Sequence, residues 1–182
     1  MSRDPIPEAP LVEAEHGKAP EGEGWFVVNV ADTPASASPG AGHAHFFEAT
    51  LGDFPDFGIN IHVLQPGEPN ALYHAEEGQE TFLVLQGECL LIVEEQERTL
   101  RQWDFFYAAP WTAHVIVGAG DGPCAVLMVG ARNAGEGLVY PVSEVAQRHR
   151  AGVEIETTLG EEAYPSMGWE RPENVRADWP PH

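Results

Sequence analysis

The chain has 182 residues, with nine Lys and Arg against 29 Asp and Glu, so its formal net charge is -20 at pH 7. A charge of this sign repels phosphate backbones and anionic head groups, which argues against nucleic-acid and membrane-surface partners. The length favours one domain with tails, because two domains would each have too small a core.

The first predicted segment, residues 1–24, is a loose arm. It holds four prolines among scattered Glu and Gly, and such a composition buries too little apolar surface to offset the entropy of ordering. It has no apolar stretch of signal-peptide length, and the longest apolar run of the chain, residues 124–129, is far too short to span a bilayer. We therefore expect a soluble, cytoplasmic protein whose arm lies on a partner subunit.

Residues 25–140 show the pattern of a domain built from many short strands. Runs rich in Val, Ile, Leu and aromatic residues alternate with clusters of Gly, Pro, Asp and Glu, and no run has a helical period. This pattern predicts an all-β antiparallel sandwich or barrel and no parallel α/β sheet. The predicted strands are 25–30, 44–50, 58–64, 71–75, 80–86, 88–94, 97–101, 104–108, 113–118 and 124–130. The two cysteines, Cys89 and Cys124, stand alone in such strands, so we expect reduced core cysteines.

Residues 141–182 are predicted to form one short helix and an extended tail. Ser143 is a suitable N-cap, Glu144 lies at the positive end of the helix dipole, and the basic residues 148–150 lie at its negative end. The remaining segment, 161–182, has four prolines and two tryptophans. We expect it to lie over the surface of the domain or of a neighbour.

The stretch YHAEEGQETFLVLQG, residues 73–87, places one histidine and three carboxylates around the start of a buried strand. His74 and Glu76 lie two residues apart on a predicted strand, so their side chains share a face. Glu80 begins the next apolar run, and His114 lies on a later strand. If these strands face one another, the four side chains converge in the interior, where they could hold one metal ion.

The spacing resembles the signature of the cupin superfamily, whose members are small jelly-roll β-barrels (double-stranded β-helices) that usually hold a divalent metal. The first half of that signature reads G-x5-H-x-H-x(3,4)-E-x6-G. His74 matches its first histidine, Glu80 its glutamate and Gly87 its last glycine. Glu76 replaces the second histidine, and Gly67 lies one residue too far upstream.

The second half of the signature reads G-x5-P-x-G-x2-H-x3-N, and here His114 matches the histidine. Trp103 and Trp111 stand for its two glycines, Ala109 for the proline and Gly118 for the asparagine. The turn residues are thus altered while the ligand histidine is kept.

The resemblance covers residues 58–130 and implies a cupin jelly-roll barrel with one divalent metal ion. Two imidazoles and two carboxylates leave a divalent ion formally neutral, whereas three imidazoles and one carboxylate leave it positive, so this ion would be a weaker Lewis acid. Such ligands suit zinc, iron, manganese or nickel. Glu77 or Gln79 could take the place of Glu76 as a ligand. The alternative to a metal site is that residues 76–78 form a solvated turn and that the histidine is hydrogen-bonded within the protein. The implied ligands are His74, Glu76, Glu80 and His114.

Further residues are candidates for the wall of a ligand pocket. On strand 58–64, Asn60 and His62 share the face opposite the isoleucines, and that face is either solvent or cavity. The aromatic candidates beside the ligand strands have core packing as their alternative role. His43 and His45 imitate an H-x-H pair without an acid at the right spacing, so we interpret them as loop and strand-edge residues. The pocket candidates are His62, Tyr73, Tyr107 and Trp111.

These features support functions of different classes, which a shared fold cannot separate. One is a metal-dependent enzyme, dioxygenase-like or isomerase-like, acting on a small organic molecule. The alternative is a non-catalytic metal or small-ligand binding barrel, a sensor or storage module. A third is a structural dimer in which Glu76 has abolished metal binding. A cavity-facing base beyond the ligands would favour the enzyme, and a cavity filled by side chains would favour the binder. We also expect a homodimer, as small cupins dimerise through sheet faces.

Overall fold

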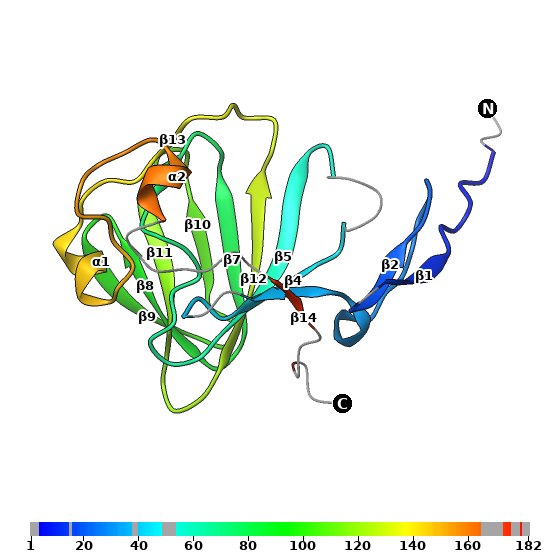
Figure 1. Ribbon diagram of the computed structural model, residues 1–182, viewed down its shortest axis with the longest axis horizontal. Coiled ribbons are helices and arrows are strands. Elements are labelled where there is room, and N and C mark those ends of the chain that lie inside the picture. Colours follow the sequence, from blue (N-terminus) through cyan, green and yellow to red (C-terminus); the bar gives the residue numbers. More distant parts are fainter. Residues whose placement is uncertain are drawn as a thin grey trace.

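The structure is a computed structural model, and it describes residues 4–14, 16–37, 40–48, 54–164, 173–175 and 179. Strands dominate these residues, and the helices among them are short (Figure 1). The strands are β1 (Leu11–Ala14), β2 (Gly17–Pro20), β3 (Ala35–Ala37), β4 (His43–Phe46), β5 (Phe57–Leu64), β6 (Ala75–Glu76), β7 (Glu80–Gln86), β8 (Glu88–Val93), β9 (Gln96–Arg101), β10 (Phe105–Ala108), β11 (His114–Ala119), β12 (Cys124–Ala131), β13 (Leu138–Val139) and β14 (Glu173–Val175). The helices are the 3-10 turn η1 (Val30–Asp32), α1 (Glu144–Arg148) and α2 (Gly160–Ala163).

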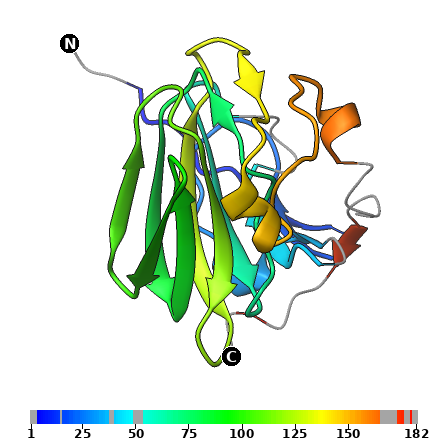
Figure 2. The same cartoon turned by 90° about the vertical axis from the view of Figure 1, so that its left-hand side faces the viewer.

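Two antiparallel sheets carry the domain (Figures 1 and 2). The larger has the strand order β10-β7-β12-β5-β4-β3-β14, and the smaller has the order β11-β8-β9. Both sheets contribute side chains to one buried cluster, so the main core lies between them. The members of this cluster are Leu64, Phe82, Val84, Cys89, Leu91, Ile116, Cys124, Val126 and Met128.

Strand β11, which carries His114, is covered on both faces. Ile116 points into the core between the sheets, whereas Val115 and Val117 pack against Tyr73 and the residues around α1. A strand covered on both faces reads as a continuous apolar run, and the sequence AHVIVG is of this kind. This burial holds the backbone that carries His114 in a fixed position.

The turns of the second signature half keep their backbone shape despite the substituted glycines. Trp103 and Trp111 have φ angles of 76° and 65°, the left-handed region that glycine adopts most easily. At Gly118, where the signature has asparagine, a Cβ atom would come 2.2 Å from the carbonyl oxygen of Gln65, so only glycine fits. The conformation is therefore retained at two positions where the usual residue is lost.

The predicted helix is confirmed. It spans Glu144–Arg148, and the hydroxyl of its N-cap Ser143 accepts a hydrogen bond from the Ala146 amide at 3.0 Å. The predicted tail contains α2 and the strand β14, which pairs with β3. Trp179 donates from its indole to the Gln86 side chain at 3.3 Å, so this residue of the tail does lie on the domain. The other tail tryptophan, Trp169, falls outside the described residues.

The N-terminal segments differ from expectation. The region predicted as a loose arm forms the hairpin β1-β2, which stands away from the two sheets (Figure 1). The prediction of a strand over residues 25–30 is wrong, since Trp25 makes only an isolated bridge to Glu8 before the turn η1. Val27 is exposed, and within this run Val30 packs against a buried cluster that contains Ile61 and Val63. No helix in the described ranges has the length and apolar character needed to cross a membrane.

Candidate metal centre

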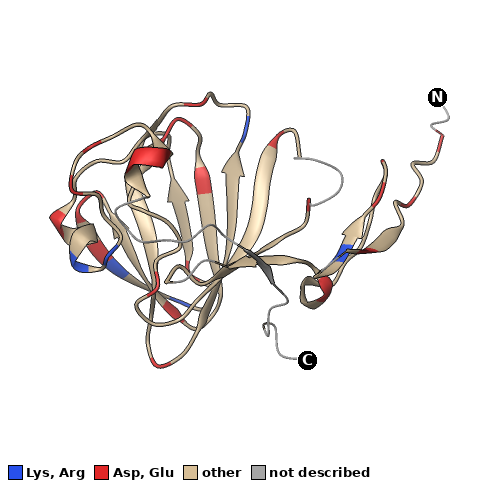
Figure 3. Ribbon diagram, in the orientation of Figure 1, with Lys and Arg blue, Asp and Glu red and all other residues tan. Residues whose placement is uncertain are grey.

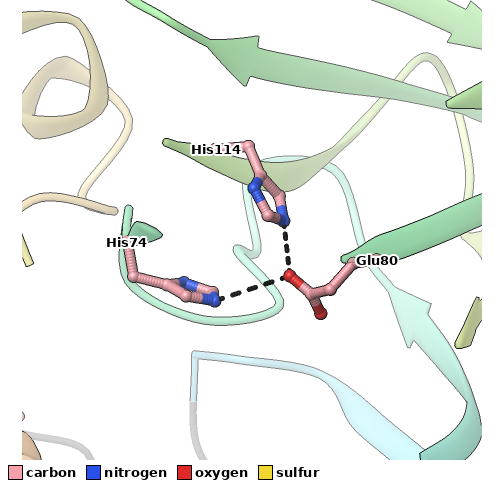
Figure 4. Close-up of side chains that lie close together, drawn as sticks. All are labelled: His74, Glu80 and His114. Atoms are coloured by element: carbon pink, nitrogen blue, oxygen red, sulfur yellow. Dashed lines mark ion pairs between the residues drawn. The ribbon is translucent and has the colours of Figure 1, made fainter. Parts of the chain in front are cut away.

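Two histidines from different segments face each other across a backbone pair. The amide of His74 donates to the carbonyl of His114 at 3.2 Å, and the amide of His114 donates back to the carbonyl of His74 at 2.9 Å. This pairing sets their rings side by side, with centroids 5.3 Å apart. Glu80, the first residue of β7, points toward both rings (Figure 4).

The three side chains form a cluster with metal-ligand spacing. One carboxylate oxygen of Glu80 lies 2.9 Å from Nε2 of His114 and 3.9 Å from Nε2 of His74. Ligands bound at about 2.0–2.2 Å place two donor atoms of one ion no more than roughly 4.4 Å apart. All three donor atoms lie within 4.8 Å of one another. The cluster therefore fits one ion after small side-chain movements.

Backbone carbonyls fix which ring nitrogen of each histidine faces Glu80. Nδ1 of His74 lies 2.7 Å from the carbonyl oxygen of Leu72, and Nδ1 of His114 lies 2.8 Å from that of Thr112. A carbonyl accepts only from a protonated nitrogen, so both Nδ1 atoms carry hydrogen and both Nε2 atoms remain as donors to a cation. This orientation is typical of metal-binding histidines.

Two of the three groups are held in a form that binds metal, whereas an ion would have to displace the proton that Glu80 favours on His114. Burial would raise the pKa of Glu80, but the hydrogen bond and charges of the neighbouring histidines outweigh it and the pKa falls. Burial would likewise lower the pKa of His114, yet the Glu80 carboxylate outweighs it and raises that pKa. Burial and the charge of His114 lower the pKa of His74. An ionised carboxylate and a neutral His74 are both forms that bind metal.

Comparison with protein families matches residues 60–130 to the family described as Cupin domain. Residues 60–130 form a cupin domain. The matched segment contains β7 to β12 and all three residues of the cluster. The predicted all-β cupin fold is therefore confirmed, as is the resemblance seen in the spacing of His74, Glu80 and His114.

Solved structures resemble the cupin domain in fold. A provisionally assigned sugar phosphate isomerase from Acidithiobacillus ferrooxidans ATCC 23270 is 26% identical with a TM-score of 0.42, and the match covers 46% of this chain and 54% of that one. A cupin-superfamily sugar phosphate isomerase from Silicibacter pomeroyi DSS-3 is 23% identical with a TM-score of 0.46, covering 53% and 68%. The polyketide cyclase RemF from Streptomyces resistomycificus is 15% identical with a TM-score of 0.49, covering 58% and 78%.

These likenesses do not extend to activity. All three TM-scores lie below 0.5, and the chain spans about half the length of the Acidithiobacillus protein. A comparison with curated proteins gives no match. The function of the cupin domain has to be inferred from its own residues.

Glu76 lines the same cavity as His74 and Glu80 but lies outside the set of donor atoms within 4.8 Å. Desolvation, followed by the charge of Glu80, raises the pKa of Glu76 to about 7. The alternatives are engaged elsewhere, since a Glu77 oxygen accepts from the Gly137 amide and Gln79 accepts from the Tyr107 hydroxyl. The role of Glu76 as fourth ligand stays a prediction.

A cavity of about 410 Å³ opens beside the cluster. His62 lines it, so the second face of β5 is cavity and not solvent. Burial is the largest cause that lowers the pKa of His62 to about 4, with the charge of His43 second. Asn60, two residues earlier on β5, lies on the same wall. A neutral imidazole thus faces the cavity beside the candidate ligands.

The aromatic pocket candidates are placed elsewhere, because none of them belongs to the cavity lining. Tyr73 is buried in the cluster around β11, and its hydroxyl accepts a hydrogen bond from the Glu95 amide at 3.3 Å. Tyr107 and Trp111 are both half exposed. Core packing was the alternative role for the aromatic candidates, and Tyr73 has this role.

The His43 and His45 pair also lies outside the cavity lining. His45 is buried on β4, where its Nδ1 lies 3.1 Å from the Thr33 hydroxyl and its ring is 6.0 Å from Trp179. The prediction of loop and strand-edge positions for this pair is wrong, since both residues lie on β4, which pairs with β5 on one side and with β3 on the other.

Other lining residues carried no sequence signal. Tyr140 and Tyr164 form an aromatic pair with centroids 5.9 Å apart, and the Tyr140 ring lies 6.0 Å from His74. Both come from the segment after the cupin signature, so motif spacing does not reach them. Arg132 also lines the cavity, directly after β12.

Proposed function

We propose that the protein is a metal-dependent cupin enzyme that acts on a small organic molecule, in a dioxygenase-like or isomerase-like reaction. The observation that carries this proposal is the cluster of His74, Glu80 and His114, of which His74 and Glu80 line an open cavity while His114 is buried behind them. His62 adds a cavity-facing base that the cluster does not use. A site for binding alone needs no such group.

The donor set bears on the kind of ion. Two histidines and one carboxylate with open positions are the ligand pattern of non-haem iron oxygenases, and zinc, manganese and nickel accept the same donors. When bound, the ion would supply Lewis acidity or electron transfer at the open positions. The protein's part is to fix the ligands through the Leu72 and Thr112 carbonyls and to face the substrate with His62 and Tyr140.

A non-catalytic binding module is the second candidate, and the cavity itself is the observation that favours it. A hollow of about 410 Å³ lies within the range of small-molecule sites. A sensor or storage protein would use it equally well. An enzyme converts the bound compound into a product, whereas a binding module releases it unchanged, so detection of product distinguishes the two.

Metal uptake by the untagged protein tests the proposal. We expect about one divalent ion per chain after incubation with iron, zinc, manganese or nickel, measured by elemental analysis. Glu80→Gln removes the anionic donor and should lower the content sharply. A content below about a tenth of an equivalent for all four metals would rule out the metal-dependent enzyme.

Glu76→Gln is the comparison variant for the fourth ligand. If Glu76 binds the ion, its loss lowers metal affinity as the loss of Glu80 does; if it only faces the cavity, the metal content stays near that of the wild type. Both variants preserve side-chain size, so a difference between them reports on coordination.

We further propose that the protein is a homodimer, built through the apolar surface around β10. Four aromatic side chains there, which we call the β10 patch, are 51% to 68% exposed. At about 150–250 Å² per aromatic side chain, the patch offers roughly 400–600 Å², against about 800 Å² per partner in a standard interface. The patch consists of Trp103, Phe105, Tyr107 and Trp111.

The N-terminal hairpin region supplies a second apolar surface on the same chain. Ile6, Trp25 and Val27 are more than half exposed, in a segment that stands off the sheets (Figure 1). A second copy of the chain can cover both surfaces at once, because in a two-fold dimer each hairpin region can lie on the patch of the other copy. Contacts between uncharged aromatic side chains also suit two chains of charge -20, which repel each other.

Phe105→Glu should separate the dimer. It places a charge in the middle of the β10 patch, where burial without a partner is costly. We expect the wild type to have twice the mass of one chain by light scattering at micromolar concentration, and the variant to have the mass of one chain. Ile155→Glu is the control, since Ile155 is 80% exposed and lies outside the patch. A monomeric wild type would contradict the proposal.

A further inference from the structure

Arg132 places a cation on the cavity wall of a chain that has few. Only nine of the 182 residues are Lys or Arg, and blue segments are sparse among the red ones (Figure 3). Among the residues that line the cavity, Arg132 is the basic one. A cation in this position calls for an explanation, because the protein as a whole repels anions.

Hydrogen bonds from both terminal nitrogens hold the guanidinium in place. One terminal nitrogen donates to a carboxylate oxygen of Glu48 at 2.8 Å, and the other donates to the carbonyl of Phe54 at 2.9 Å. Across the guanidinium lies Gly58, where a Cβ atom would come 3.1 Å from the nearer nitrogen. The glycine leaves room for the flat group, so its orientation is defined from several sides.

The Glu48 carboxylate is buried, with the residue 9% exposed, whereas a third of the Arg132 side chain is exposed. Burying a carboxylate is costly, and a buried ion pair seldom repays that cost in stability. What the pair does provide is a planar guanidinium fixed beside the cavity. Such a fork matches a carboxylate in geometry as well as in charge.

We propose that Arg132 binds the carboxylate of a small organic acid in the cavity and that Glu48 positions the guanidinium. This inference rests on the proposed function, since the rest of the acid then faces His74 and Glu80, which line the same cavity. A carboxylate fits better than a phosphate, because the described cavity lining offers one guanidinium and no second cation to balance a dianion. The competing reading is that Glu48 neutralises Arg132 and the cavity takes an uncharged compound.

Benzoate and benzamide are matched probes that differ in charge and hardly in shape. Their dissociation constants are measured by ligand-observed NMR on the full chain after incubation with zinc. We expect benzoate to bind at least about tenfold more tightly than benzamide. Arg132→Gln should bring the two constants close together.

Arg132→Gln leaves the buried Glu48 unpaired and could unfold the chain for that reason alone. The double variant Glu48→Gln with Arg132→Gln removes both charges, and we expect it to fold, to retain zinc and to lose the preference for benzoate. Equal binding of the two probes by the wild type, no benzoate binding at all, or a preference that survives in the double variant would overturn the inference.

Zinc content measured on the same samples separates this inference from the proposed function. A wild type without zinc that still prefers benzoate through Arg132 would refute the metal-dependent enzyme and leave the carboxylate site standing. A zinc-loaded wild type that prefers benzamide would refute the carboxylate site and leave the metal-dependent enzyme standing.

Discussion

His114→Ala should abolish most metal binding by the cupin domain. The variant removes one of three donor atoms and also the ring that stands 2.9 Å from the Glu80 carboxylate. Loss of a residue that merely supports a ligand costs about 10–100-fold in metal affinity, so loss of the ligand itself should cost more than about 100-fold. Titration with a chromophoric metal chelator measures this difference.

His43→Ala is the matched control for that experiment. It removes an imidazole from an H-x-H pair that lies outside the cavity lining, so metal affinity should remain that of the wild type. Equal losses in the two variants would refute the assignment of His114. Circular dichroism of both variants verifies that a loss of metal does not come from unfolding.

Phe82→Ala should have the largest effect on stability. Phe82 is 2% exposed and lies in the core between the two sheets. Its ring stands 5.6 Å from Phe106 and 5.2 Å from His114. Truncation leaves a cavity there, and such changes cost about 3–5 kcal/mol in the free energy of unfolding. Chemical denaturation of the metal-free protein measures it.

Ile155→Ala is the control for Phe82→Ala. Ile155 is 80% exposed, and truncation at such a surface position changes stability by no more than about 0.5 kcal/mol. Because the Phe82 ring also contacts the imidazole of His114, we expect Phe82→Ala to weaken metal binding as well. A variant as stable as the wild type would show that the two sheets do not share the core described above.

The strands β5 and β7 to β12 could be predicted because their side chains alternate between core and surface or run apolar throughout. The predicted strand 71–75 is wrong, since those residues form only an isolated bridge at His74 and the start of the two-residue strand β6. Strand β7 begins at Glu80 and ends at Gln86 as predicted. The run 25–30 is equally apolar, but among the described residues it pairs with the rest of the chain only through the bridge from Trp25 to Glu8, and local composition cannot reveal that. Whether an apolar run forms a strand depends on a neighbouring strand with which it can pair, and the tertiary fold decides which segments are neighbours.

The candidate site also contains residues that the sequence predicts and residues that it does not. The cupin spacing predicted the three clustered residues, because it indicates which strand positions point into the interior of the domain. These residues are His74, Glu80 and His114. Glu48 and Arg132 are 84 residues apart, and no pattern in the sequence links them. Tyr73 directly precedes His74 in the sequence, but its side chain points into the core around β11 instead of into the cavity.

The backbone pairing of His74 with His114 gives the ion a mechanical role. The segment before His74 reaches β11 through a few isolated contacts and does not belong to a continuous ladder there. An ion held by both imidazoles and by Glu80 would act as a cross-link that joins this segment to β7 and β11. Removing the metal would then loosen the wall of the cavity as well as empty its centre, so occupancy and substrate affinity would fall together.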